Sequence, residues 1–274
     1  MAKNLAARVT DSYFFRTNPI ISRLARVEDT DAENCCTYAG ITMKLLYFIA
    51  MVVVGVVTCM LLTYIPGGEA AFSENGMPIS GVGSGVLVVA AIMLIICPLL
   101  AMLIKVTIPV TGAMFCFGTG YVMSWASMAY GKEYRSSILL AMILTMIVVS
   151  SMGFLYFTGK VRVTERFRTV LTSLIMCSIL SGILVFILAL IPGTRPFVTS
   201  LRANMLINIG GSILYVVIAS LFLLVDFDTI RRAVDDGLPK KYEWWASFGL
   251  AFSVIWLFFK ILELLSKLKK FNKK

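Results

Sequence analysis

Histidine is absent from this sequence of 274 residues, and charged residues make up only 15% of it. Without imidazole side chains, histidine-ligated metal sites, histidine-dependent catalytic triads and histidine pH switches are excluded. Any proton chemistry in this chain must therefore rest on carboxylates, lysines or cysteines.

Cysteine pairs of the C-x-x-C type are also missing. Two cysteines are adjacent in a polar N-terminal stretch and four lie within apolar runs, in the order Cys35, Cys36, Cys59, Cys97, Cys116 and Cys177. This distribution is typical of free thiols that pack as small side chains, and not of a zinc or dithiol redox site.

Apolar residues dominate the chain, with a hydrophobic share of 59% where soluble domains have roughly half. They gather in runs that approach the roughly 20 residues needed to cross hydrocarbon. The runs cover 43–64, 82–104, 107–129, 137–157, 170–191, 205–225 and 246–265. We therefore predict an all-α polytopic membrane protein, with a polar tail over 1–42, a bundle of seven transmembrane helices over 43–268 and a basic tail over 269–274.

The net charge of +10 lies in short loops and tails and forms no basic face with interleaved aromatic residues, so no nucleic-acid partner is expected. Lysine and arginine are most frequent before run one, after run four and after run six, which predicts a cytoplasmic N-terminus. A full crossing by run seven puts the C-terminal lysines outside, whereas a re-entrant segment keeps them inside. We expect a full crossing.

The most informative residues of run six are Asp226 and Asp228, which follow directly on an apolar span. The helix is expected to continue to Gly237, a natural C-terminal cap, which places Asp226 at the inner margin of the membrane. On the same helix, a polar stripe is predicted from Asn204, Asn208, Gly211, Ser212, Tyr215 and Asp226. The stripe is explained either by helix packing or by an ion or proton path.

Run seven carries Lys260, Glu263 and Lys267 at spacings that share one helix face. One interpretation is a self-neutralising ladder near the helix end. The other is an ion pair between Asp226 and Lys260 or Glu263. Straight antiparallel helices leave Lys260 about 15 Å too deep for this pair, so a kink or surface segment near Gly249 is required.

The chain resembles the transmembrane Bax inhibitor motif family, in particular its bacterial branch, over nearly its whole length. The matching stretches are Asn18-Pro19, Thr37-Tyr38-Ala39-Gly40 with Lys44, Gly159 to Thr164 with Phe167-Arg168, Asp226-Phe227-Asp228, Gly237 to Lys241 and Glu243-Trp244. The resemblance implies seven helices with the last one central, in the bacterial plasma (inner) membrane. It also implies a pH-sensitive calcium leak that two acidic residues on helices six and seven control.

The family's acid on helix six matches Asp226, whereas its acid on helix seven falls on Lys260. A lysine at this position departs from the family pattern, and its positive charge should repel Ca²⁺. Glu263, Asp228 or Glu243 is a possible substitute for the missing acid. We expect no resident cofactor. If any residue binds metal it is Asp226, and Ca²⁺ is a candidate cargo.

Two functions follow as hypotheses. The first is a pH-gated cation leak in which acidification protonates Asp226 and loosens the contact between helices six and seven. The alternative is a membrane regulator that transports nothing and binds another membrane protein, such as a quality-control protease. An enzyme is not expected, because carboxylates two residues apart on a helix point roughly 200° apart and form no catalytic dyad.

Overall fold

The structure is a computed structural model, and it describes residues 35–64, 82–129, 131–161, 163–191, 194 and 205–272. Within these residues the chain forms seven α-helices and one short 3₁₀ turn, η2. Their bounds are α4 Tyr38–Tyr64, α5 Val82–Leu103, η2 Lys105–Thr107, α6 Ile108–Ala129, α7 Gly131–Phe157, α8 Glu165–Leu190, α10 Met205–Asp235 and α11 Tyr242–Asn272. The predicted all-α class is confirmed.

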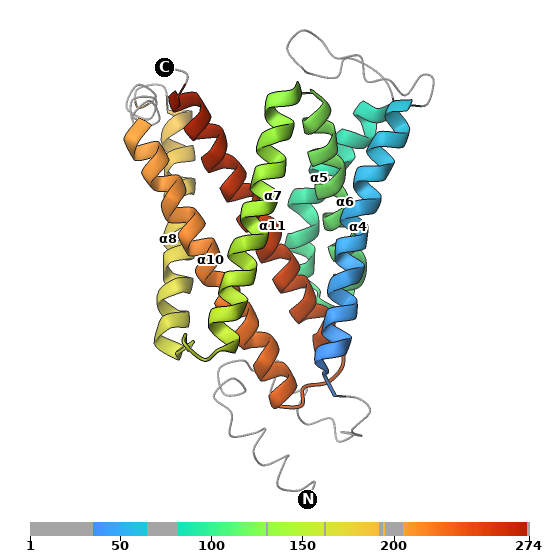
Figure 1. Cartoon of the computed structure of the whole chain (residues 1–274), viewed down its shortest axis with the longest axis vertical. Helices are drawn as coiled ribbons and strands as arrows, with labels where there is room; N and C mark the ends of the chain where they lie inside the picture. Colours follow the sequence, from blue (N-terminus) through green and yellow to red (C-terminus); the bar gives the residue numbers. More distant parts are fainter. Residues whose placement is uncertain are drawn as a thin grey trace, which may run out of the picture.

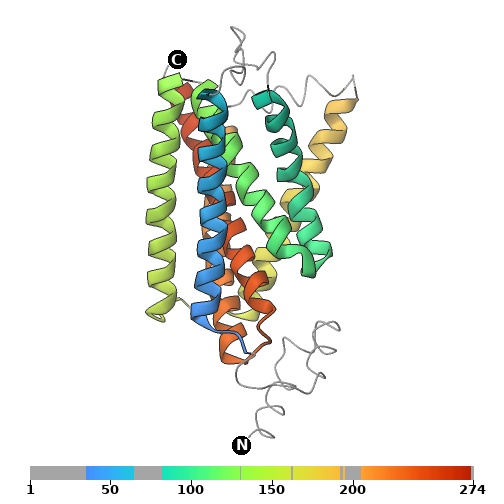
Figure 2. The same cartoon turned by 90° about the vertical axis from the view of Figure 1, so that its right-hand side faces the viewer.

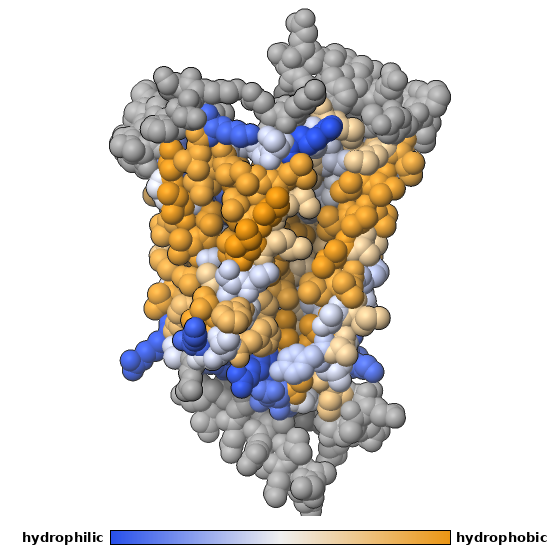
Figure 3. All heavy atoms as spheres, in the orientation of Figure 1, coloured by the Kyte–Doolittle hydropathy of each residue, from blue (hydrophilic) through white to orange (hydrophobic). Residues whose placement is uncertain are grey.

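The outer surface of the bundle is apolar. Six helices are long and apolar enough to cross a bilayer, and the described part of α5 adds a shorter apolar helix over Gly85–Ala101. Large side chains such as Ile95, Met146 and Phe154 are exposed. Figure 3 shows an apolar band with hydrophilic side chains near both ends. Such a surface fits lipid and not water, and helices satisfy their own backbone groups there. The chain is an integral membrane protein with several spans.

The C-terminal helix α11 lies in the middle of the bundle (Figures 1 and 2) and packs against α4, α6, α7 and α10. The predicted central position of the last helix is therefore confirmed. We name the two ends of the bundle after residues of α11. The Glu243 end is where α4, α6, α8 and α11 begin, and the Lys267 end is where α11 finishes.

The turn between α10 and α11 follows from its sequence. Gly237 has a positive φ of 62°, and the Leu238 and Gly237 amides donate to the carbonyls of Ala233 and Val234. This is the glycine cap expected after the last turn of a helix. The turn directs α11 back along α10, so the two helices run antiparallel.

Several helices begin earlier or end later than the predicted apolar runs, because the backbone hydrogen bonds of a helix continue beyond hydrocarbon. α4 begins at Tyr38 and not at residue 43, and α7 begins at Gly131 and not at residue 137. The last helix runs without interruption for 31 residues, which is about 46 Å. No re-entrant break or kink near Gly249 is found in it.

Candidate functional site

Asp228 of α10 is buried at the Glu243 end and ties three helices together. Its Oδ2 accepts from Arg168 Nη2 of α8 at 3.0 Å and from Arg232 Nε at 2.8 Å, and its Oδ1 accepts from the Tyr156 hydroxyl of α7 at 3.2 Å. Arg232 also pairs with Glu165 of α8 at 2.7 Å. Charge-assisted bonds of this kind are strong, so the Asp228 side chain is fixed in place and joins α7, α8 and α10.

Asp226 lies two residues away and faces the opposite direction, toward α11. A Cβ added to Gly249 would be 3.9 Å from its Oδ1. The Ser253 hydroxyl is within hydrogen-bonding reach, and Arg168 is near enough to attract its charge. Its Oδ2 is buried without a hydrogen-bond partner among the described residues. A buried carboxylate oxygen without a partner is costly, which singles out Asp226 from the other acids of the bundle.

Glu243 lies in the first turn of α11 and is fully buried. It forms an ion pair with Lys44 of α4 and accepts from the Thr37 amide at 3.0 Å and the Thr37 hydroxyl at 3.3 Å. The Lys44 amino group also lies 5.2 Å from the ring centroid of Trp244. From the sequence, Glu243 is predicted as a possible substitute for the missing acid, and its pairing with Lys44 is not foreseen. Lys44 is the one charged residue of the run 43–64, and a lone lysine in an apolar span was the signal that a buried counter-charge exists.

Cys35 and Cys36, which precede α4, bind the turn between α10 and α11, close to Glu243. Cys35 forms an isolated β-bridge with Pro239, and the Cys36 amide donates to the Leu238 carbonyl at 2.7 Å. Burial, followed by the negative charge of Glu243, raises the pKa of the Cys36 thiol to about 12. The thiol therefore stays protonated and donates to the Pro239 carbonyl at 3.3 Å.

The close approach of α4 to Glu243 requires a glycine at position 40, because an added Cβ would collide with the Glu243 carboxylate. We expect Gly40→Ala to destabilise the protein by about 1–3 kcal/mol, the usual cost of overpacking. Gly85→Ala is the matched control, since a Cβ at Gly85 meets nothing within 4 Å. Thermal unfolding of both variants in detergent checks this, and equal melting temperatures would contradict it.

A second polar cluster joins α10 and α11 at the Lys267 end. Glu263 accepts from Lys260 at 3.0 Å and from Lys267 at 2.7 Å, and Lys267 also donates to the Ser212 hydroxyl at 2.6 Å. The Lys260 amino group lies 4.9 Å from the ring centroid of Tyr215. We call the three α11 residues Lys260, Glu263 and Lys267 the charge ladder. The three residues are paired along one helix face, although two lysines share a single carboxylate, and Ser212 and Tyr215 of the α10 polar stripe contact the lysines.

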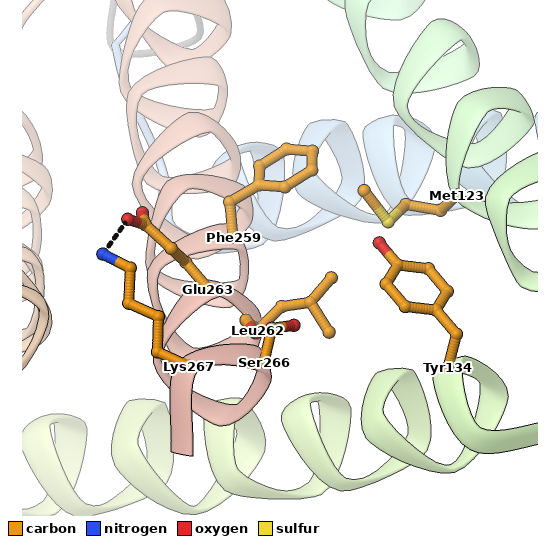
Figure 4. A pocket seen from close by; sticks show the side chains of 7 residues that line it. All are labelled: Met123, Tyr134, Phe259, Leu262, Glu263, Ser266 and Lys267. Carbon is orange, nitrogen blue, oxygen red and sulfur yellow. Dashed lines mark hydrogen bonds and ion pairs between the residues drawn. The ribbon is translucent and has the colours of Figure 1, made fainter. Parts of the chain in front are cut away.

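The remaining stripe residues are placed as follows. The Asn208 carbonyl accepts from Lys267 at 3.5 Å, and Asn204 lies outside the described residues. Beside the ladder is an open cavity of about 380 Å³ (Figure 4). It is lined by Met123 of α6, Tyr134 of α7 and Phe259, Leu262, Glu263, Ser266 and Lys267 of α11.

The comparison with known families agrees with this arrangement. A family model described as Bax inhibitor 1 like matches residues 18–270. The chain belongs to the Bax inhibitor 1-like family. No curated protein and no solved structure matches it. The family resemblance drawn from the sequence is thereby confirmed.

In this Bax inhibitor 1-like chain, the predicted contact between Asp226 and Lys260 or Glu263 is wrong. The α11 residues opposite Asp226 are Gly249 and Ser253. Lys260 lies seven residues beyond Ser253, which is about 10 Å along a helix. The physical reason is that α11 continues straight past Gly249, so nothing removes the offset. The α11 side chain that faces Asp226 is therefore Ser253. Lys260 belongs to the polar cluster at the Lys267 end of the bundle.

Proposed function

We propose that this Bax inhibitor 1-like protein is a pH-sensitive cation leak across its membrane, with Asp226 as the titrating group. The observation that carries the proposal is the buried, unpartnered Oδ2 of Asp226 between α10 and α11. Ionisable side chains within spans are rare and tend to mark ion or proton paths. The match to the family supports the same function.

The charges around Asp226 give the direction of the response. Ionised Asp226 lies within hydrogen-bonding reach of Ser253 of α11, and the positive charge of Arg168 of α8 is near enough to attract it. Protonation removes the charge and with it the attraction. Asp228 is held by two arginines and the Tyr156 hydroxyl, and it keeps its place. Acidification then loosens the contact between α10 and α11 and raises the flux.

The orientation belongs to the same proposal. The Glu243 end carries Lys160, Arg166, Arg231, Lys240 and Lys241, so we assign it to the cytoplasmic side of a bacterial plasma membrane. Acid on that side is expected to reach Asp226 first. Reconstitution in liposomes with cation-sensitive dyes tests the function, and absence of any pH-dependent cation flux would reject it.

A second candidate function, that of a regulator that binds another membrane protein, is favoured by α8. None of the residues that the structure describes in its most apolar stretch is buried in the bundle. Ser173, Cys177 and Ser181 follow each other at intervals of four residues and are exposed. Small residues at this spacing let membrane helices approach closely.

We expect a short bis-maleimide linker in native membranes to join Cys177 to a partner cysteine if α8 carries such a contact. The exposed position of Cys177 makes it the accessible thiol of this helix. The adduct should appear as a higher band on a denaturing gel and vanish in Cys177→Ser. Persistence of the band in Cys177→Ser would place the contact elsewhere, and absence of a band in the wild type would leave α8 facing lipid.

A further inference from the structure

The polar residues of α10 and α11 meet in a single antiparallel register. At the Glu243 end Asp226 faces Ser253, farther along Tyr215 meets Lys260, and at the Lys267 end Ser212 binds Lys267. Polar and charged side chains of both helices thus follow the seam between them. An ion that passes Asp226 along this seam next meets the charge ladder.

The ladder carries an excess of positive charge. Lys260 and Lys267 share one carboxylate, that of Glu263, and the ion pairs of the described residues give these lysines no second acid. The α10 groups that contact the two lysines are the Asn208 carbonyl, the Ser212 hydroxyl and the Tyr215 ring, all uncharged. Among the described residues, two ammonium groups therefore share one carboxylate, which leaves an excess of one positive charge.

The position of Lys260 is fixed from two sides. Glu263 holds its amino group from one turn farther along α11, and the Tyr215 ring of α10 attracts it by a cation–π contact. The Lys260 side chain is only 25% exposed. Its charge is thus held between the helices, where it is less screened than at a surface.

The described lining of the cavity beside the ladder offers a cation no carboxylate apart from that of Glu263. Figure 4 shows Glu263 and Lys267 joined at one side of it, with Phe259, Leu262 and Met123 on the others. Its remaining polar lining residues are Tyr134 and Ser266, which are uncharged. Among the described lining residues, Glu263 is the only carboxylate, and it already accepts from two lysines.

We infer that the charge ladder makes the leak select monovalent over divalent cations, and that Lys260 is the residue that sets this selectivity. The inference rests on the proposed leak and names its class of cargo. Coulomb repulsion is proportional to the charge of the ion, so a fixed ammonium opposes a divalent ion twice as strongly as a monovalent one. A divalent ion such as Ca²⁺ also requires several oxygen ligands, which the ladder does not offer.

The experiment is a comparison of K⁺ and Ca²⁺ flux into liposomes that contain the full-length protein, at mildly acidic pH and equal ionic strength. We expect the wild type to pass K⁺ in preference to Ca²⁺, and Lys260→Gln to raise the Ca²⁺-to-K⁺ flux ratio by about tenfold. Lys260→Arg keeps the charge and should keep the wild-type ratio. Lys241→Gln, at the exposed α10–α11 turn, is the matched control and should change nothing.

The outcomes separate the two proposals. A wild type that passes Ca²⁺ as readily as K⁺, or a flux ratio unchanged in Lys260→Gln, overturns the selectivity inference and leaves the leak in place. If the wild type passes no cation at any pH, both the leak and the inference fail. Size-exclusion profiles identify a variant that does not fold, and Glu263→Gln then gives a second test. Glu263→Gln leaves both lysines without a carboxylate partner. We expect it to lower the flux of K⁺ and of Ca²⁺, and to lower the Ca²⁺ flux by the larger factor.

Discussion

Asp226→Asn is expected to abolish the pH dependence of cation flux and to fix it at the acidic level. The amide resembles the protonated carboxyl group in shape and carries no charge for Arg168 to attract. At neutral pH the variant should therefore pass cations about tenfold faster than the wild type, which corresponds to about 1.4 kcal/mol in a two-state equilibrium. Flux into liposomes measured from neutral to mildly acidic pH gives both quantities.

The matched control for this substitution is Asp235→Asn. Asp235 lies on the same helix and pairs with Arg231 at 3.3 Å, but both side chains are more than half exposed. An exposed ion pair of this kind contributes little, so the control should retain the wild-type pH profile. A pH profile that is unchanged in Asp226→Asn would remove Asp226 from the mechanism.

Glu243→Gln is expected to cause the largest loss of stability in this chain. The substitution leaves Lys44 with a 17% exposed side chain and without its carboxylate partner, at the junction of α4 and α11. Breaking a buried ion pair by removing one partner typically costs about 3–5 kcal/mol. The Thr37 amide and hydroxyl also lose a charged acceptor. Unfolding in detergent, followed by intrinsic tryptophan fluorescence, measures the effect.

Two further variants separate the lost ion pair from other effects of the substitution. Glu165→Gln removes a carboxylate that is 58% exposed and paired with Arg232, and it should cost less than about 1 kcal/mol. Lys44→Met combined with Glu243→Leu replaces both charges with apolar groups, which often restores much of the stability. A double variant as unstable as Glu243→Gln would show that the loss does not come from an unpaired charge.

The helices of this protein could be predicted because membrane helices are encoded locally. The length of an apolar run, a glycine at a helix end and a proline near a helix start each act within a few residues of the chain. Thus Gly237 closes α10, and Pro109 sits at the start of α6. The contacts of charged residues were harder to predict, because they depend on the rotation and offset of whole helices. One interpretation placed Lys260 or Glu263 opposite Asp226, but Ser253 lies there and Lys260 is about 10 Å farther along the helix.

The sequence by itself determined that this chain is a helical membrane protein of the Bax inhibitor 1-like family, and that its few acids within apolar runs need special surroundings. Only the tertiary structure decided which partner each acid has. Asp228 binds two arginines, Glu243 binds Lys44, Glu263 binds two lysines, and Asp226 keeps a buried oxygen without a hydrogen-bond partner among the described residues. The physical reason is that hydrophobicity is a property of each residue, whereas an ion pair exists only where two helices place opposite charges within a few ångströms.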